Sequence, residues 1–464
     1  MKYFLAIIGG GPAGYTAAEK ASKAGKDVVL FEQNALGGTC LNVGCIPTKS
    51  LLYGAKQYYN ATHAAKYGVT AENVVFDYAA MQKRKTIVVR KLVAGIKARL
   101  NNEHCTVVNG TAKPLPTSPQ REENKIIRIE CNGEEYEAEN LMICTGSTNF
   151  VPPIPGIKDN PAIWDSTDAL AASELPESIV IVGGGVIGME FATLYHELGI
   201  PVTVIEAMPT ILPNLDPEVV QILLEKYKKA GINILTSTKV ESLDGGKVTA
   251  NGEVYEAEKV LVSVGRRANL QGLEALSDIE MERGAIKIDD FCKTNLPNVY
   301  ACGDVTGKIM LAHVASRQAE VAVEHMLNNS IDNNNQSSIN RSIVNRSIVN
   351  YNAIPSVVYT NPEIASVGIT EAQAESMSIP VEVRKLPMTF SGRFMAENEG
   401  ETGLCKMIVD AKNHSILGVH CIGNPCSEFI AAASFAVRNG YTVPEMQQVV
   451  FPHPTVSEIL HEIL

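Results

Sequence analysis

This 464-residue sequence has no long apolar run and has fewer positive than negative charges. No run reaches the roughly 18–20 residues of a membrane-spanning helix, so we expect no membrane partner. The chain has 40 Lys and Arg residues and 51 Asp and Glu residues, which gives a net charge of −11. This balance disfavours a nucleic-acid partner, which is held by neutralising phosphates, and it also disfavours binding to an anionic membrane surface.

Cysteine is sparse as well, with ten residues and no disulfide-scaffold spacing. The apolar stretch Tyr3–Ile8 is too short for the core of a signal peptide and runs directly into glycines. We therefore expect a cytoplasmic protein in which most cysteines are small buried hydrophobic residues. At roughly 150 residues per domain, the length indicates about three domains.

Glycine, by contrast, occurs in a repeated pattern. An apolar run followed by GxGxxG occurs twice, at Tyr3–Gly14 and at Ser178–Gly188. After each copy come a helix-like stretch and a second apolar run that ends in glutamate. The glycines are Gly9, Gly11 and Gly14 in the first copy and Gly183, Gly185 and Gly188 in the second. They permit a tight turn, close approach to a pyrophosphate, and close packing of helix on strand. Two such units predict two dinucleotide-binding domains with parallel sheets.

The glutamates that close the two units are expected to bind ribose hydroxyls. Glu32 and Glu206 each lie 18 residues after the third glycine of their unit. A carboxylate at Glu206 accepts from free ribose hydroxyls and repels a 2′-phosphate, which favours NAD over NADP. Arg266 and Arg267 follow the next predicted strand, however, and keep NADP open as an alternative.

A second motif, GGTCLNVGCIPTKSLL at 37–52, indicates redox chemistry. Four residues separate Cys40 from Cys45, so their disulfide would be a poor structural cross-link but a plausible redox switch. We expect a helix to open near Thr39, with its N-terminus favouring a thiolate. Lys49, four residues after Cys45, adds positive charge.

A third motif, FPHPTVSEIL at 451–460, contains a candidate acid–base pair. Prolines flank His453 and restrict the backbone on both sides. Glu458, in a predicted helix at 456–463, could hold one ring nitrogen and leave the other as a base. Taken alone, a loop histidine is more often structural.

The remaining pattern predicts further elements. Strands are expected at 141–147, 261–266 and 298–304, with helices at 81–100 and 311–327. Strands at 356–360, 403–410 and 417–422, with a helix at 426–438, predict an α+β C-terminal domain. Residues 328–352 are rich in Asn and Ser and repeat RSIVN, which indicates a surface loop or linker.

In combination, these motifs resemble the class I pyridine nucleotide–disulfide oxidoreductases, most closely the branch that oxidises dihydrolipoamide. The resemblance rests on the three motifs above and on GGGVIGMEFA, VYACGDV, LAHVASRQA and YNAIPSVVYTNPEIASVG, in the order of the family. It implies an α/β fold with two Rossmann-like domains and a C-terminal α+β dimerisation domain. The implied boundaries are 1–148 for FAD, 149–268 for NAD, 269–335 for a segment completing the FAD site, 336–352 for the linker and 353–464 for the interface.

The resemblance also implies site residues. FAD would contact the first glycine motif, Glu32, Lys49, Ala112, Thr145, Gly146, Ser147, Asp304, Met310, Leu311, Ala312 and His313. NAD would contact the second glycine motif, Glu206, Val240 and Gly265. Cys45 would lie nearest the flavin and Cys40 would exchange with substrate. Lys49 would pair with Glu190, and His453 with Glu458 would serve the disulfide of the other subunit in a homodimer.

The implied reaction is oxidation of protein-bound dihydrolipoamide with reduction of NAD⁺, without a metal. Implied partners are lipoyl domains and core subunits of 2-oxo acid dehydrogenase or glycine-cleavage complexes. Two alternatives stay open: an NAD(P)H-dependent disulfide or metal-ion reductase of the same family, and a non-catalytic docking or redox-sensing subunit. Phe451-Pro452 and the Asn/Ser-rich insert depart from the family pattern.

Overall fold

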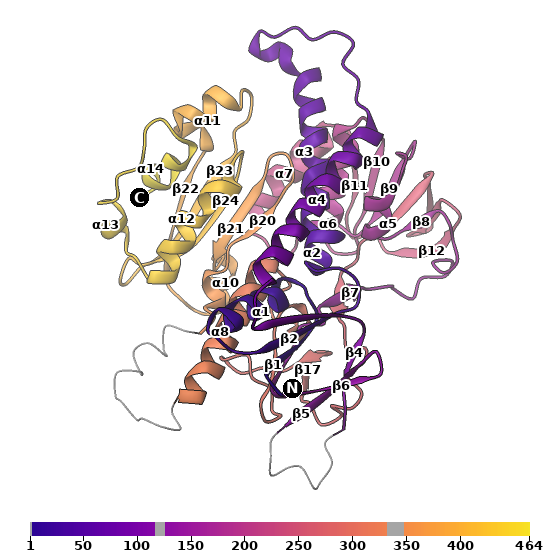
Figure 1. The fold of residues 1–464 in the computed structure, drawn as a ribbon. Coiled ribbons are helices and arrows are strands. Elements are labelled where there is room, and N and C mark those ends of the chain that lie inside the picture. Colours follow the sequence, from indigo (N-terminus) through magenta and orange to yellow (C-terminus); the bar gives the residue numbers. More distant parts are fainter. Residues whose placement is uncertain (1, 117–125, 332–347) are drawn as a thin grey trace. The chain divides into compact units, whose positions relative to one another are not determined.

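The computed structural model describes residues 2–116, 126–331 and 348–464 (Figure 1). The described residues form two compact units. The first comprises Met1–Thr48, Lys83–Phe150 and Gly265–Val349, and the second comprises Lys49–Gln82, Val151–Val264 and Asn350–Leu464. Residues 336–347 of the predicted linker lie outside the described residues.

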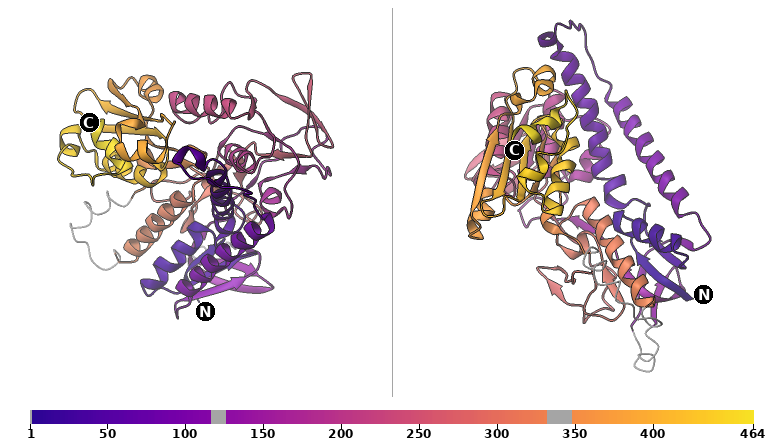
Figure 2. Two further views of the ribbon diagram at one scale, coloured as in Figure 1. Left: turned by 90° about the horizontal axis from the view of Figure 1, so that it is seen from above. Right: turned by 90° about the vertical axis from the view of Figure 1, so that its left-hand side faces the viewer.

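The first unit is built on a seven-stranded sheet in the order β3-β2-β1-β6-β5-β4, with β19 also paired to β6. Its strands are β1 (Lys2–Ile8), β2 (Val28–Glu32), β3 (Cys105–Asn109), β4 (Ala112–Pro114), β5 (Ile127–Cys131), β6 (Glu134–Ile143) and β19 (Val299–Ala301). The inner strands run parallel, and β1 and β2 are buried almost throughout, as a sheet covered on both faces requires. Helices α1 (Pro12–Lys23) and α8 (Ala312–Ile331) lie side by side (Figure 2).

The second unit repeats this plan with a five-stranded parallel sheet in the order β11-β10-β9-β15-β8. The strands are β8 (Ile163–Trp164), β9 (Ile179–Val182), β10 (Val202–Ile205), β11 (Asn233–Leu235) and β15 (Lys259–Val262). The helices are α5 (Ser166–Ala171), α6 (Val186–Glu197) and α7 (Pro217–Lys229). An antiparallel meander of β12 (Val240–Asp244), β13 (Lys247–Ala250) and β14 (Glu253–Glu256) follows α7 and β11.

The C-terminal part of the second unit is an antiparallel sheet in the order β20-β21-β24-β23-β22. The strands are β20 (Ser356–Val358), β21 (Ile364–Gly368), β22 (Val381–Leu386), β23 (Leu404–Asp410) and β24 (Ile416–Ile422), and α12 (Cys426–Asn439) packs on β21 and β24. These elements enclose their own apolar core. The two Rossmann-like sheets and this α+β module are the fold class expected from the sequence.

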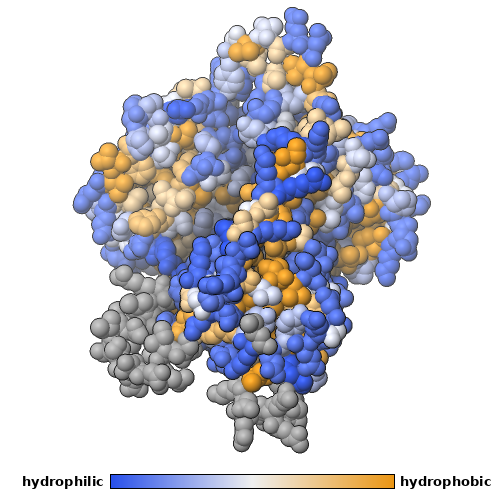
Figure 3. Space-filling model, in the orientation of Figure 1, coloured by the Kyte–Doolittle hydropathy of each residue, from blue (hydrophilic) through white to orange (hydrophobic). Residues whose placement is uncertain are grey.

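The remaining elements connect these sheets. They are α2 (Gly38–Asn42), α3 (Cys45–Thr62), η1 (Ala64–Tyr67), α4 (Tyr78–Leu100), β7 (Ser147–Asn149), β16 (Arg266–Ala268), β17 (Met281–Glu282), β18 (Ala285–Ile286), η3 (Asp304–Thr306), η4 (Tyr351–Ala353), α10 (Glu371–Ser376), η5 (Met388–Phe390), α11 (Gly392–Glu397), α13 (Val443–Met446), η6 (Val456–Glu458) and α14 (Ile459–Glu462). In α4 only Ile96 and Leu100 are buried, and Figure 3 shows hydrophilic side chains interspersed with hydrophobic ones along this helix.

An ion cluster around the buried Lys406 joins α7 to the C-terminal sheet. Lys406 on β23 is 1 % exposed, and its ammonium lies 2.9, 2.8 and 2.7 Å from carboxylate oxygens of Asp216, Glu218 and Glu371. Asp216 is the N-cap of α7 and accepts from the backbone N–H of Glu218. Burial alone would lower the pKa of Lys406, but the three carboxylates outweigh it and raise that pKa.

The structure corrects two predicted helices. The expected helix opening near Thr39 is interrupted: α2 ends at Asn42 and α3 begins at Cys45. A Cβ built on Gly44 would lie 2.9 Å from the carbonyl oxygen of Thr39, so this tight connection needs glycine. The expected helix at 456–463 is instead a 3₁₀ turn, η6, followed by the four-residue α14.

Strand ends also differ from the prediction. The strand expected at 141–147 begins earlier, at Glu134, because Asn132 and Gly133 form a positive-φ turn that pairs β5 with β6. The strand expected at 261–266 ends at Val262, and Gly265, with φ of +120°, separates it from β16.

Candidate functional site

The first glycine motif forms a turn that tolerates no side chain at its ends. Gly9 has φ of +106°, and a Cβ there would meet the carbonyl oxygen of Cys144 at 2.2 Å. A Cβ on Gly14 would meet the carbonyl oxygen of Gly9 at 1.8 Å. Gly11 is the N-cap of α1, and no side chain caps this end of the helix. The first-turn N–H groups therefore remain available for an anion such as a pyrophosphate.

The glycine turn and the N-terminus of α1 together form a cradle for such an anion. Glu32, at the end of β2, lies at the edge of this cradle. Its carboxylate is 7 % exposed and accepts hydrogen bonds from the backbone N–H groups of Gly10 and Asn34, both at 2.7 Å. These bonds fix the carboxylate while each oxygen keeps a further acceptor position, which suits a ribose hydroxyl.

The second glycine motif reproduces this geometry in the second unit. Glu206 accepts from the backbone N–H groups of Gly184 and Met208, both at 2.6 Å. A Cβ on Gly188 would meet the carbonyl oxygen of Gly183 at 2.0 Å, whereas a Cβ on Gly185 would meet no atom within 4 Å. Gly185 is the N-cap of α6 and carries no side-chain cap. The repeat seen in the sequence is therefore a repeat of hydrogen-bonded structure.

The other residues predicted to contact FAD are distributed over the first unit, except Lys49 in the second. Ser147 donates to Asp304 Oδ2 at 2.6 Å, and Thr145 donates to the carbonyl oxygen of Asn269 at 2.6 Å. Ala112 begins β4 and Gly146 has φ of +72°. Met310, Leu311, Ala312 and His313 lead into and open α8. The hydroxyl of Ser147 also accepts from Arg266 Nε at 2.8 Å, so this arginine is engaged beside Asp304.

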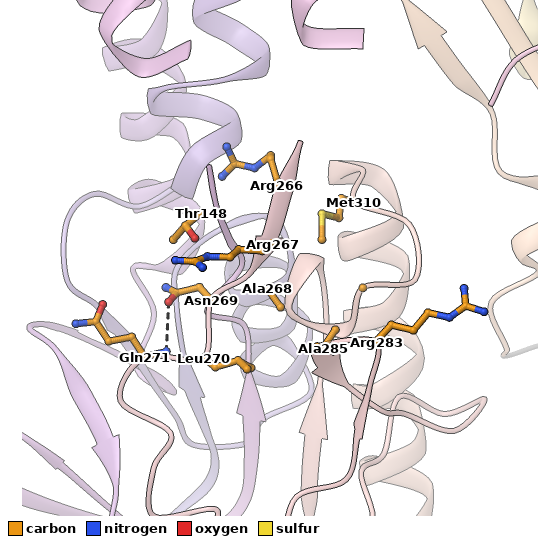
Figure 4. A pocket seen from close by; sticks show the side chains of 12 residues that line it. Thr148, Arg266, Arg267, Ala268, Asn269, Leu270, Gln271, Arg283, Ala285 and Met310 are labelled. Carbon is orange, nitrogen blue, oxygen red and sulfur yellow. Dashed lines mark hydrogen bonds between the residues drawn. The ribbon is translucent and has the colours of Figure 1, made fainter. Parts of the chain in front are cut away.

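An open pocket of about 620 Å³ lies next to these residues. Met310, Thr148, Arg267 and Asn269 are among its lining residues (Figure 4). Figure 4 shows that the side chain of Arg283 extends away from Arg267, so the two guanidinium groups do not converge on one anion. Because Met310 is a predicted FAD contact, the pocket adjoins the proposed flavin site.

The two motif cysteines lie on successive helices. Cys40 is half-buried in α2, and Cys45 is exposed at the first position of α3, the helix end at which a thiolate is favoured. Tyr15 on α1 was not singled out from the sequence. Burial first, and then the negative charge of Cys40 and to a lesser extent Cys45, raises its pKa. This side chain therefore lies in the electrostatic neighbourhood of both sulfurs.

Lys49 and Glu190 form a pair within the second unit. The Lys49 ammonium lies 2.8 and 2.7 Å from the two carboxylate oxygens of Glu190, which is 4 % exposed. The backbone N–H of Tyr359 donates to Glu190 at 3.2 Å, and the ring centre of Tyr359 lies 4.5 Å from the ammonium. Tyr359 lies in the quoted segment YNAIPSVVYT, but its role as a third member of this cluster is visible only in the structure.

His453 and Glu458 also come together. His453 Nδ1 lies 2.8 Å from Glu458 Oε1, and Glu458 Oε2 accepts from the backbone N–H of Thr455 at 2.7 Å. The Thr455 N–H and then His453 lower the pKa of Glu458. The imidazole is 80 % exposed, so Nε2 can reach a substrate group while the carboxylate orients the ring. Thr455 was not predicted; it belongs to a capping box with Glu458.

The other two predicted NAD residues lie at strand boundaries. Val240 begins β12 in the second unit, and Gly265 begins the following segment of the first unit. Among the described residues, no group of three or more His, Cys, Asp or Glu side chains is arranged to hold a metal ion. None of the helices in the described ranges is long and apolar enough to cross a membrane.

Comparison with family models agrees with this geometry. The model of pyridine nucleotide-disulphide oxidoreductases matches residues 3–319, and the model of their dimerisation domain matches residues 354–464. The chain belongs to this family. It is accordingly an oxidoreductase that carries the family's dimerisation domain, and the family uses FAD and NAD.

Curated relatives and solved structures extend over nearly the whole chain. A dihydrolipoyl dehydrogenase of Chlamydia pneumoniae is 36 % identical over 98 % of this chain and 95 % of its own length. One from Bacillus subtilis is 36 % identical over 99 % and 97 %. LpdA from Mycobacterium tuberculosis has a TM-score of 0.87 at 25 % identity, covering 99 % and 98 %. RclA from Escherichia coli, a HOCl-induced flavoprotein disulfide reductase, has a TM-score of 0.83 at 28 % identity, covering 99 % of each chain.

The residues of both cradles fit the cofactors of this family. In each cradle, an uncapped helix N-terminus and a glutamate held by two backbone N–H groups provide complementary groups for a pyrophosphate and a ribose. At Gly185 no protein atom fills the space that a side chain would take, which leaves room for a bound nucleotide.

Proposed function

We propose that this oxidoreductase oxidises dihydrolipoamide to lipoamide and reduces NAD⁺ to NADH. One observation carries the proposal: a chain about 36 % identical to dihydrolipoyl dehydrogenases over nearly its full length contains Cys40, Cys45 and the hydrogen-bonded pair of His453 and Glu458. The glutamate at 206, in place of a basic residue, favours NAD over NADP.

The proposed steps use the chain's own side chains. His453, oriented by Glu458, accepts a proton from one thiol of dihydrolipoamide. The resulting thiolate attacks Cys40 in a Cys40–Cys45 disulfide; a mixed disulfide forms and Cys45 leaves as a thiolate. The second substrate sulfur then attacks the substrate sulfur of the mixed disulfide, and the bond to Cys40 breaks. The departing Cys40 sulfur takes the proton of that second thiol, so lipoamide is released, Cys40 is a thiol and Cys45 a thiolate. When bound, FAD supplies the two-electron chemistry that reoxidises this pair at the expense of NAD⁺.

Charge near Cys45 supports the leaving thiolate. Cys45 begins α3, and the positive end of a helix dipole stabilises negative charge there. Lys49 follows in the same helix, and we propose it as a FAD contact whose charge is held by Glu190. In a two-electron couple, about 30 mV of potential corresponds to about 1.4 kcal/mol, so such charges tune the disulfide potential measurably.

We further propose which segments of the chain bind each cofactor and which segment forms the subunit interface. Residues 1–148 with 269–335 would hold FAD, 149–268 would hold NAD, and 353–464 would form the interface of a homodimer in which His453 serves the partner subunit's disulfide. Lipoyl domains and core subunits of a 2-oxo acid dehydrogenase or glycine-cleavage complex would be the partners. Location in the cytoplasm stays a prediction.

The test is turnover by a cysteine variant. Cys45→Ser is expected to abolish oxidation of dihydrolipoamide while the protein stays yellow with bound FAD. Cys105→Ser is the matched control, because burial raises the pKa of Cys105 to about 11 and the thiol stays protonated at neutral pH. Unchanged turnover of Cys45→Ser would refute the proposed relay.

The likeness to RclA favours a second candidate, an NAD(P)H-dependent disulfide or metal-ion reductase. RclA has also been solved as a Cu(II) complex, at 28 % identity to this chain. Anaerobic assays that compare NAD⁺ with NADP⁺ and dihydrolipoamide with other thiols separate the candidates. Strong preference for NADPH as donor, with no oxidation of dihydrolipoamide, would select this second function.

A further inference from the structure

Helix α4 is strongly basic in an otherwise acidic chain. It contains no Asp or Glu, and its cations are Lys83, Arg84, Lys85, Arg90, Lys91, Lys97 and Arg99. The helix thus contributes +7 to a net charge of −11, which leaves −18 for the rest of the chain. Such segregation of charge creates a local positive field that attracts an acidic partner.

Four of these cations form one exposed face. Lys83, Arg90 and Lys97 recur every seven residues, about two helical turns, and Lys91 lies beside this row. All four are exposed, and within the described part of the chain no ion pair engages any of them. The row spans about 21 Å at a rise of 1.5 Å per residue. We call these four residues the α4 basic face.

The C-terminal end of α4 leads to the motif cysteines through contacts within the first unit. The Arg99 guanidinium lies 5.5 Å from the ring centre of Tyr15 on α1 and forms an ion pair with Glu19 at 3.2 Å. Tyr15 experiences the charge of Cys40. The last turn of α4 therefore lies against α1, the helix that carries Tyr15.

The start of α1 also touches the start of α2. A Cβ built on Gly38 would lie 2.7 Å from the Cα atom of Gly11. Cys40 follows Gly38 by two residues in α2. This backbone contact places the cysteine helix against α1 independently of any electrostatic argument.

We propose that the α4 basic face docks the acidic surface of the protein domain that carries the dihydrolipoyl group. The inference rests on the proposed function and adds where the carrier binds. Docking there holds the tethered dithiol beside the cysteine helix and raises its effective concentration, so it lowers KM for the carrier and leaves kcat unchanged. A free dithiol substrate has no acidic surface and gains nothing from this face.

The features of the helix disfavour two other polyanionic partners. A charge of −18 outside α4 repels a nucleic acid beyond the helix itself. The exposed apolar residues Ile87 and Leu92 are five positions apart, about 140° around the helix, and form no continuous stripe for insertion into a lipid surface.

The experiment compares two substrates with two charge-matched variants. The test variant combines Lys83→Glu, Arg90→Glu and Lys97→Glu. The control combines Lys158→Glu, Lys229→Glu and Lys247→Glu, three exposed lysines of the second unit with the same total charge change. Each holoenzyme is assayed with free dihydrolipoamide and with a reduced, acidic lipoyl domain, and bound FAD verifies folding.

For the lipoyl domain at low ionic strength, we expect KM of the test variant to rise at least about tenfold with kcat unchanged. That increase shrinks at about 0.5 M salt, where charges are screened within a few ångström. KM for free dihydrolipoamide stays within about twofold in both variants. A lipoyl domain whose surface carboxylates are replaced by amides loses the same factor with the unaltered enzyme.

Several results would overturn the inference. One is an equal rise of KM in both triple variants, which reflects net charge alone. Another is a test variant that becomes monomeric while the control stays dimeric, which makes the face a subunit contact. If neither substrate is oxidised at all, the proposed function fails. Calorimetric titration with the lipoyl domain then tests the docking face separately: loss of binding in the test variant alone supports the face, and equal binding by both variants refutes it.

Discussion

Glu197 offers a quantitative test of burial in the second unit. This α6 residue is 5 % exposed and accepts a hydrogen bond from Asn361 Nδ2 at 2.7 Å. Burial raises the pKa of Glu197 from its ordinary 4.5 to about 7, although Asn361, Lys56 and Lys226 act in the opposite direction. The folded protein therefore holds a proton that the unfolded chain releases.

The direction of the pH effect follows from this proton. Between about pH 4.5 and pH 7 the native state binds more protons than the unfolded state, so stability contributed by protonated Glu197 is lost as the pH rises. Protonated Glu197 contributes about 3 kcal/mol in total to the free energy of unfolding, and about 2–3 kcal/mol of this contribution is lost between pH 5 and pH 8. Glu197→Gln keeps the acceptor for Asn361 but has no proton to lose.

The measurement is urea unfolding followed by fluorescence of Trp164, the single tryptophan of the chain, which lies on β8 in the same unit. The free energy of unfolding of Glu197→Gln, relative to the unaltered protein, is expected to rise by about 2–3 kcal/mol from pH 5 to pH 8. Glu225→Gln, an exposed α7 variant, is the control and should show no such trend. Parallel pH profiles for Glu197→Gln and the unaltered protein would refute the reasoning.

Three further predictions concern the ion cluster, the second cradle and the base. Lys406→Met leaves the fully buried Asp216 uncompensated and should lower the free energy of unfolding by about 3–5 kcal/mol in urea titrations; a change below about 1 kcal/mol would contradict this. Gly185→Ala should raise KM for NAD⁺ at unchanged thermal stability. Gly188→Ala should unfold at a lower temperature, because its Cβ meets the carbonyl oxygen of Gly183, and equal thermal stability of the two variants would refute this steric argument. His453→Gln should slow turnover at neutral pH by about 10²–10⁴-fold in steady-state assays, and a mild effect would exclude it as the base.

Much of the candidate site was predictable because its signals are local. A GxGxxG between a buried strand and a helix is a short-range pattern, and the hydrogen bond from the Gly10 N–H to Glu32 closes within one βαβ unit. The spacing of Cys40 and Cys45 likewise indicates its chemistry without reference to the rest of the fold. The pairing of Lys49 with Glu190, 141 positions apart, was predictable only through resemblance to a family.

What escaped prediction depends on contacts that are distant in sequence. The interruption between Asn42 and Cys45 depends on how closely Gly44 approaches Thr39, a steric detail that periodicity does not encode. Tyr359 joins Lys49 and Glu190 because β20 brings it there, and Lys406 gathers carboxylates from α7 and α10. None of these residues carries a local pattern that distinguishes it from other tyrosines or lysines.

By itself, the sequence determined the two glycine turns with their glutamates and the order of the main strands and helices around them, since strand, turn and helix patterns act over a few residues. Only the tertiary structure decided which charges neutralise one another and which stay exposed. Burial depends on packing among remote segments, so the same residue type is a buried cation at Lys406 and part of a solvent-facing row at Lys97.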